Sequence, residues 1–316
     1  DTAGNNGAVY SKAYVLDTQA LAPTVALVTD SGSSAVDKIT NVGTLSVSGT
    51  EAGALVQYSS DNVNWATTAP ALSQGANTVY VRQTDIAGNV SASTAFTFTY
   101  DTQAPGVPTV ALATDSGSSG TDKITNVGTL AVSGTEAGAV VQYSANGTSG
   151  WSTTAPSLVQ GANTVYVRQL DVAGNAGAST SFTFTYDSVA PATTIATATF
   201  SADTGSSATD LITKTASQTV SGTLSATLAA GETVRVSLDG GTTWQNATAT
   251  VGQTGWSLSG VTLTGSSTLQ VKVVDTAGNN GAVYSKAYVL DTQALAPTVA
   301  LVTDSGSSAV DKITNV

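Results

Sequence analysis

Apolar residues alternate with small polar residues in short runs along most of the chain. A period of two is typical of strands that bury one face. Val79 and Val81 form one such inward-facing pair, and Phe96, Phe98 and Tyr100 form another set. We predict strands over residues 24–29, around Leu45 and Val47, around Val56 and Tyr58, and over 78–84 and 94–100. Weaker pieces near Trp65 and Ala71-Leu72 complete about seven strands.

The same scheme returns twice further along the chain, and no segment has the pattern of a helix. The second occurrence predicts strands over 109–114, around Leu130 and Val132, around Val141 and Tyr143, around Val165 and Val167, and over 182–186. The third predicts strands over 220–224, 233–238, 269–274 and 283–290. Short alternating strands separated by turn residues every eight to twelve positions favour an all-β chain of antiparallel β-sandwiches.

Internal repeats set the predicted domain organisation. Residues 1–42 and 275–316 are identical, so the sequence has a period of 274 residues (275 minus 1). An aspartate closes an aromatic or Val-rich run at each unit boundary, and we call Asp17, Asp101, Asp187 and Asp291 the linker aspartates. We predict domains at 17–100, 101–186 and 187–290, the last divergent and longer. Residues 1–16 are predicted to be the last strand of a preceding third domain, and 291–316 the start of another first domain, as in a window cut from a longer protein.

Two further acidic motifs recur in every sequence repeat. The acidic loop, D-S/T-G-S-S-x-x-D-x-I-T, lies within residues 29–41, 114–126, 202–214 and 303–315 and holds two aspartates seven positions apart. The D-x-A-G-N turn lies at 1–5, 85–89, 171–175 and 275–279. Gly and Asn accept positive φ, so this second motif predicts a tight turn between two strands.

Composition removes several classes of function. The net charge is −11, and such a surface repels nucleic acid. Absence of Cys and His excludes disulfides, zinc-thiolate sites and a Ser-His catalytic pair. No apolar run is long enough to span a membrane. Candidate catalytic carboxylates would recur in every unit, whereas an active site is normally unique, so we predict that the chain is not an enzyme.

The motifs, taken in this order, resemble a known family. The acidic loop, the Tyr-Ser…Trp pattern at 58–65 and 143–151, V-R-Q-x-D-x-A-G-N at 81–89 and 167–175, and the D-x-x-A-P linker are similar to the bacterial immunoglobulin-like repeats of giant RTX-type and biofilm-associated adhesins. The resemblance implies tandem immunoglobulin-like sandwiches in a linear rod, secreted to the cell surface or biofilm matrix and stiffened by calcium at the linkers. The linker at 17–23 has two extra residues, and Lys214 replaces an Asn.

Sandwich topology independently predicts where the acids meet. In an immunoglobulin-like domain the acidic loop and the last strand reach the trailing end, and the D-x-A-G-N turn lies at the leading end of its own domain. The expected calcium ligands therefore form three joints: Asp30, Asp37, Asp101 and Asp171; Asp115, Asp122, Asp187 and Asp275; and Asp203, Asp210 and Asp291. Asp17 and Asp85, the linker and turn positions of the first domain, are further candidate ligands.

Calcium suits this predicted ligand set because it takes six to eight oxygen ligands. The alternative at each position is an aspartate that only shapes its own turn. We expect a structural extender whose partners are neighbouring copies, together with other cells, surfaces or matrix polysaccharide. A glycan- or surface-binding module and a filament subunit assembled by strand exchange remain alternatives.

Overall fold

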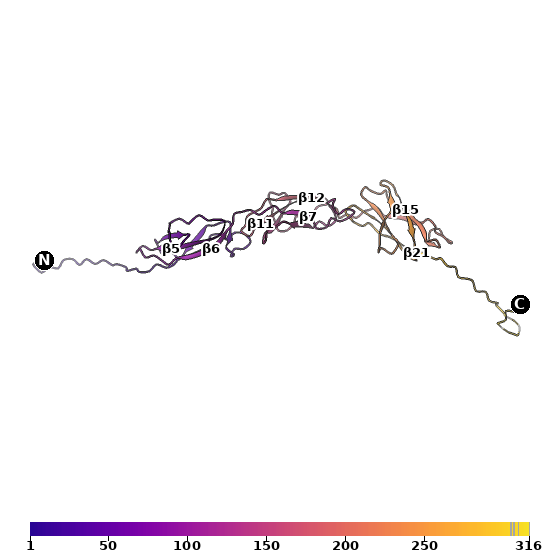
Figure 1. Cartoon of the computed structure of the whole chain (residues 1–316), viewed down its shortest axis with the longest axis horizontal. Helices are drawn as coiled ribbons and strands as arrows, with labels where there is room; N and C mark the ends of the chain where they lie inside the picture. Colours follow the sequence, from indigo (N-terminus) through magenta and orange to yellow (C-terminus); the bar gives the residue numbers. More distant parts are fainter. Residues whose placement is uncertain (304, 306, 309, 316) are drawn as a thin grey trace. The chain divides into compact units, whose positions relative to one another are not determined.

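A computed structural model of the chain describes residues 1–303, 305, 307–308 and 310–315 (Figure 1). The described residues contain strands and no helix, which confirms the predicted all-β class. None of these residues belongs to a helix that could cross a membrane. The predicted segment 291–316 includes residues 304, 306, 309 and 316, which lie outside the described residues.

The first domain is built from two facing sheets. One sheet pairs β1 (Thr24–Leu27) with β3 (Leu45–Ser48), and the other has the order β2-β6-β5-β4. These strands are β2 (Ile39–Thr40), β4 (Leu55–Ser59), β5 (Gly75–Thr84) and β6 (Thr94–Tyr100), with β5 and β6 side by side in Figure 1. Val79 and Val81 are fully buried with Phe98 between the sheets, as the alternation predicts.

Two details of the first domain differ from the prediction. The piece near Trp65 makes only an isolated bridge, Tyr58 to Ala66, and no strand covers Ala71-Leu72. In their place the two-residue strand β2 pairs in parallel with the end of β6. The described first domain therefore has six strands rather than about seven.

The second domain repeats this arrangement. Its strands are β7 (Thr109–Leu112), β8 (Ile124–Thr125), β9 (Leu130–Ser133), β10 (Val140–Ser144), β11 (Gly161–Leu170) and β12 (Thr180–Tyr186). The sheet orders are β7-β9 and β10-β11-β12-β8. Val165, Val167 and Phe184 are buried at the positions of their first-domain counterparts.

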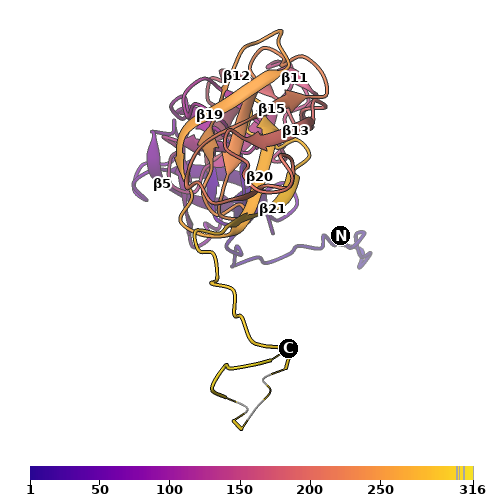
Figure 2. The same ribbon diagram turned by 90° about the vertical axis from the view of Figure 1, so that its right-hand side faces the viewer.

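The third domain has larger sheets and a larger core. One sheet has the order β13-β15-β19-β18 and the other β14-β21-β20-β16-β17; Figure 2 shows β20 beside β21. The strands are β13 (Ile195–Phe200), β14 (Ile212–Thr213), β15 (Ser217–Leu224), β16 (Thr233–Ser237), β17 (Gln245–Asn246), β18 (Thr248–Ala249), β19 (Gly255–Thr262), β20 (Ser267–Val274) and β21 (Tyr284–Leu290). Trp256 and Tyr288 lie in this core at 3% and 4% exposure.

The other tryptophans lie on sheet faces beneath a cation. The Arg82 guanidinium lies 4.1 Å from the ring centre of Trp65, and Arg168 lies 4.2 Å from Trp151. In the third domain Lys272 lies 3.9 Å from the Trp244 ring. These three tryptophans therefore pack against side chains of β5, β11 and β20.

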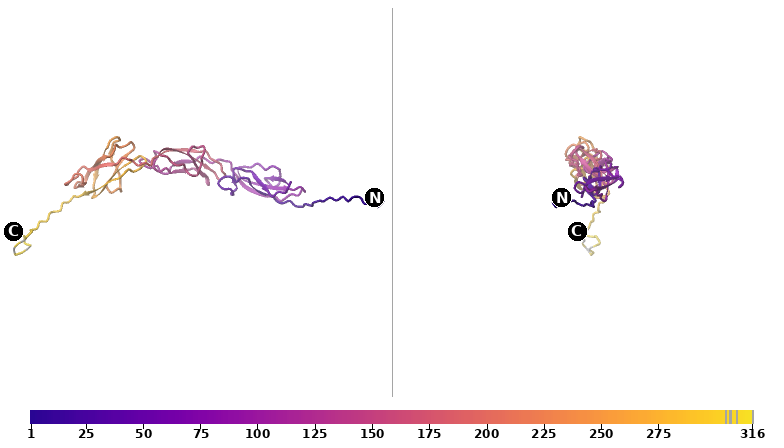
Figure 3. Two further views of the ribbon diagram at one scale, coloured as in Figure 1. Left: turned by 180° about the vertical axis from the view of Figure 1, so that it is seen from behind. Right: turned by 90° about the vertical axis from the view of Figure 1, so that its left-hand side faces the viewer.

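The described chain divides into two compact units. The first contains residues 1–113 and 129–184, and the second contains residues 114–128 and 185–316. The acidic loop at 114–126 thus belongs to the unit that contains the third domain. Residues 1–23 and the described residues after Leu290 carry no strand, as the two ends of the ribbon in Figure 3 illustrate.

Candidate functional site

The acidic loop at 29–41 is held by a small internal hydrogen-bond network. The Oδ2 atom of Asp30 accepts a bond of 2.9 Å from the backbone N–H of Lys38, a residue with φ of 61°. This positive φ turns the chain into β2. Ser31 Oγ accepts a 2.8 Å bond from the backbone N–H of Asn41, which ties the start of the loop to its end. The sequence therefore builds a rigid, closed loop before any neighbour is considered.

The other two complete loops repeat these bonds. Asp115 accepts from the backbone N–H of Lys123 at 2.9 Å, and Asp203 accepts from that of Leu211 at 3.0 Å. Lys123 and Leu211 have φ of 60° and 66°, so the positive φ is kept where the residue type changes. The looser third copy thus keeps the shape of the loop.

The D-x-A-G-N turn is closed by its own first and last residues. Asp171 accepts bonds of 2.7 Å and 2.9 Å from the backbone and side-chain amides of Asn175. The same Asn175 side chain donates to the carbonyl oxygen of the linker aspartate Asp101 at 2.8 Å. In the first domain, Asn89 uses its side-chain amide to hold the pKa of Asp85 below its usual range, against the effect of burial.

Within the first unit, the acidic loop lies directly on the turn at 171–175. Ser31 Oγ donates to the Ala173 carbonyl at 2.6 Å, and the Ser33 N–H donates to the Val172 carbonyl at 3.3 Å. Asn41 donates from its side chain to Asn175 Oδ1 at 3.1 Å. These bonds join the first sandwich to the second.

Glycine makes this approach possible. A Cβ added to Gly32, which has φ of +98°, would lie 1.9 Å from the Val172 carbonyl oxygen. Gly174, on the opposite side, would place a Cβ 3.0 Å from the Gly32 nitrogen. The two backbones therefore meet without any intervening side chain.

The second unit contains the same contact between the loop at 114–126 and the turn at 275–279. Ser116 Oγ donates to the Ala277 carbonyl at 2.7 Å, and Asn126 donates to Asn279 Oδ1 at 3.1 Å. The Ser118 N–H donates to the Thr276 carbonyl at 3.2 Å, and a Cβ on Gly117 would lie 1.9 Å from that same oxygen. The contact is thus a repeated feature of the chain.

The predicted carboxylates all shape local turns. The linker aspartates Asp17, Asp101, Asp187 and Asp291 accept from the backbone N–H two residues on, as do the second loop aspartates Asp37, Asp122 and Asp210. The turn aspartates Asp85 and Asp275 accept from an asparagine four residues on, as Asp171 does. The loop and the turn converge as topology predicts, while the carboxylates of each joint do not form a group of three within metal-binding reach among the described residues.

One group of three acids does gather in the described part of the chain. One oxygen each of Asp17, Glu51 and Asp85 lies within 4.8 Å of the other two. Asp17 and Asp85 are candidates from the sequence, and Glu51 was missed there. The signal for it is the repeat T-E-A-G at 50–53 and 135–138, which places Glu51 and Glu136 in matching turns; Ala229 takes this place in the third domain.

The donor chemistry of these residues fits calcium. The three grouped carboxylates offer only hard oxygen ligands. In each complete acidic loop, moreover, the Oδ1 atom of the first aspartate (Asp30, Asp115 or Asp203) is buried and has no hydrogen-bond partner. An anionic oxygen in that position is costly unless a cation or a donor satisfies it. Two separate features of the structure therefore suit a bound cation.

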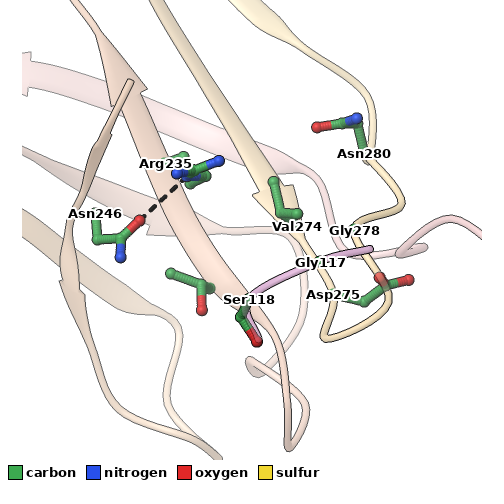
Figure 4. A pocket seen from close by; sticks show the side chains of 9 residues that line it. Gly117, Ser118, Arg235, Asn246, Val274, Asp275, Gly278 and Asn280 are labelled. Atoms are coloured by element: carbon green, nitrogen blue, oxygen red, sulfur yellow. Dashed lines mark hydrogen bonds between the residues drawn. The ribbon is translucent and has the colours of Figure 1, made fainter. Parts of the chain in front are cut away.

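A polar pocket of about 400 Å³ lies within the second unit, next to the contact between loop and turn (Figure 4). Arg235 enters it from β16 and donates to Asn246 Oδ1 at 3.1 Å. Ser118 lines it from the acidic loop, and Asp275 and Asn280 line it from the end of β20 and the segment beyond. The pocket combines one cation and one carboxylate with amide and hydroxyl groups.

Solved structures of bacterial adhesins are among those that resemble the chain. Among solved structures, the chain is similar to tandem repeats in the extending region of a large adhesion protein, with 21% identity over 86% of this chain and 74% of that one and a TM-score of 0.21. It is also similar to part of a 1.5-MDa bacterial ice-binding adhesin, with 20% identity over 88% of this chain and 100% of that one and a TM-score of 0.26. No curated protein sequence matches the chain.

A family model gives the assignment itself. The model of the bacterial Ig-like domain matches residues 16–102, 103–188 and 190–292, which together make up most of the chain. These ranges contain all three of the sandwiches described above. The chain therefore belongs to the bacterial Ig-like domain family, of which it carries three tandem copies.

Proposed function

We propose that the chain is a structural extender segment of a secreted bacterial cell-surface adhesin or biofilm-matrix fibre. The observation that carries this proposal is the contact between acidic loop and turn, which recurs with the same bonds at two successive positions. A domain that used its loops to bind a ligand would expose them. Here the loops at 29–41 and 114–126 each contact the turn of the next domain, as an extender requires.

The contact limits the motion that a linker between domains would otherwise allow. Three hydrogen bonds and the approach of two glycines act at each position, in addition to the covalent linker. A typical intramolecular hydrogen bond contributes about 1 kcal/mol. The linker already holds the two domains close to each other. Three such bonds are then enough to favour one arrangement of the two domains over the many that the linker alone would allow.

Calcium is the second part of the proposal. Asp17, Glu51 and Asp85 would hold one ion at the leading end of the first domain, and Asp30, Asp115 and Asp203 would each contribute a buried oxygen within their loops. When bound, calcium neutralises these carboxylates and ties the linker to the turns beside it. At a free calcium concentration of about 100 times the dissociation constant, one site adds about 2.7 kcal/mol to stability.

Calorimetry and small-angle scattering on the full chain, in calcium, magnesium and chelator, test the calcium proposal. We expect calcium alone to raise the melting temperature by about 10 °C or more, since 1 kcal/mol shifts a domain of this size by about 4–8 °C. Glu51→Gln keeps the size of the side chain and removes its charge, and it should abolish part of this rise. Asp61→Asn is the matched control, because Asn146 fills the same turn in the second domain.

Equal melting temperatures and equal scattering in calcium and chelator would remove the metal from the proposal. The glycan-binding alternative would use the pocket around Arg235. Binding of the chain to a glycan array, lost in Arg235→Gln, would favour that alternative over the extender.

A further inference from the structure

The turn of the first domain is a free copy of a surface that is covered elsewhere. Ala173 and Ala277, at the centre of the two contacted turns, are 1% and 0% exposed. Their counterpart Ala87 is exposed, and the neighbouring Ile86 is 82% exposed. The Asn89 side chain still donates to the carbonyl of Asp17 at 3.0 Å, so the turn has the same anchoring as the covered ones. The turn therefore keeps the hydrogen bond of the covered turns and has no acidic loop packed against it in the described chain.

The acidic loop of the third domain is the matching free half. A Cβ on Gly205 would meet no heavy atom of the described residues within 4 Å, whereas one on Gly32 or Gly117 would lie 1.9 Å from a turn carbonyl. The loop itself is closed in the same way, because Lys214 donates its N–H to Thr204 Oγ1 at 2.8 Å. Among the three complete domains of the described chain, the loop at 202–214 and the turn at 85–89 are therefore uncovered.

We propose that these two surfaces bind each other across successive repeat periods, so that the loop at 202–214 of one copy docks on the turn at 85–89 of the next. The occupant is indicated by the sequence that follows the third domain. Residues 291–316 are identical to residues 17–42, so a first-type domain begins where the third domain ends. This inference rests on the proposed extender function and adds the partner and the residues of the third joint.

The substitutions in the two halves define how this joint differs from the others. Thr204 replaces Ser31 and keeps a hydroxyl, which in the proposed joint would donate to the carbonyl of Ala87 in the next copy as Ser31 donates to Ala173. Lys214 replaces Asn41, so an ammonium group takes the place of the amide that faces the asparagine of the turn, here Asn89. The third joint keeps the hydroxyl bond and the approach of two glycines, and it exchanges a neutral amide pair for a charged donor.

A chain of two periods, made by joining residues 43–316 after residue 316, contains this joint once. Gly205→Ala in its first period adds a Cβ where the docked turn would lie. In the 316-residue chain the same substitution adds only the strain of a residue with φ of +131°. We expect the melting temperature of the third domain to fall at least about 4 °C further in the two-period chain than in the single chain. Both measurements are made in chelator, so that no metal contributes.

Two control substitutions are measured in the same two chains. Gly75→Ala places a Cβ in open space at φ of +96°, and it should shift both chains equally. Gly32→Ala disrupts a contact that both chains contain and should also shift both equally, by more than Gly75→Ala. An equal effect of Gly205→Ala in the two chains would overturn the third joint. That result would leave the extender function in place, because calcium-dependent stiffening is measured separately.

Discussion

Gln83 is a buried side chain that ties three segments of the first domain together. It is fully buried, donates to the Leu21 carbonyl at 2.6 Å and accepts from the Glu51 N–H at 2.8 Å. Gln169 makes the equivalent bonds in the second domain, and Val273 fills the same position in the third. The tie also positions Glu51, one of the three grouped acids.

Gln83→Leu keeps most of the volume of the side chain and removes both bonds. The Leu21 carbonyl and the Glu51 N–H would lose their partner, and a buried group left in this way costs about 1–3 kcal/mol. Both bonds are only partly buried, so water can replace part of what is lost. We therefore expect a loss of about 1–3 kcal/mol from the first domain. For a domain of this size that corresponds to a fall in melting temperature of about 4 °C or more.

Differential scanning calorimetry of the full chain measures this effect as a separate, earlier transition of the first domain. Gln103→Leu, at an exposed position, is the control and should leave the transitions unchanged. If the first domain melted at the same temperature in Gln83→Leu as in the unaltered chain, the buried amide would make no net contribution to stability, and the reasoning would be wrong. The third domain has Val273 at this position, and its sandwich forms without the two hydrogen bonds of the buried amide. The measurement therefore decides whether these bonds add to the stability of the first domain.

Three further outcomes are expected. Hydrogen bonds from Asn64 hold the pKa of Asp61 far below its usual range, so stability from this group is present above about pH 4 and is lost as the pH falls toward the lower value; Asp61→Asn should flatten this part of an acid-unfolding titration. Arg82→Gln removes the cation above Trp65 and should cost about 0.5–1 kcal/mol in chemical denaturation. Gly32→Ala should increase hydrogen exchange at the Ser33 N–H, measured by mass spectrometry, because its partner carbonyl is pushed away.

The strands were predictable because each sandwich buries alternate residues. Val79, Val81 and Phe98 are inward-facing in the sequence pattern and buried in the structure. The strand β2 was not predictable, because two residues carry no period. Its position depends on Lys38, whose positive φ has no signal in a lysine. The alternation of apolar and polar residues therefore predicts the sheets, whereas the geometry of the loops is seen only in the structure.

The candidate site was predictable in its topology and not in its composition. The meeting of acidic loop and turn follows from the direction of the strands, and the structure contains it in both units. The hydroxyl of Ser31 and the glycines that form the contact were absent from a prediction built on aspartates. Carboxylates are easy to recognise in a sequence with few charges. A contact made by backbone groups is marked in the sequence only by small residues.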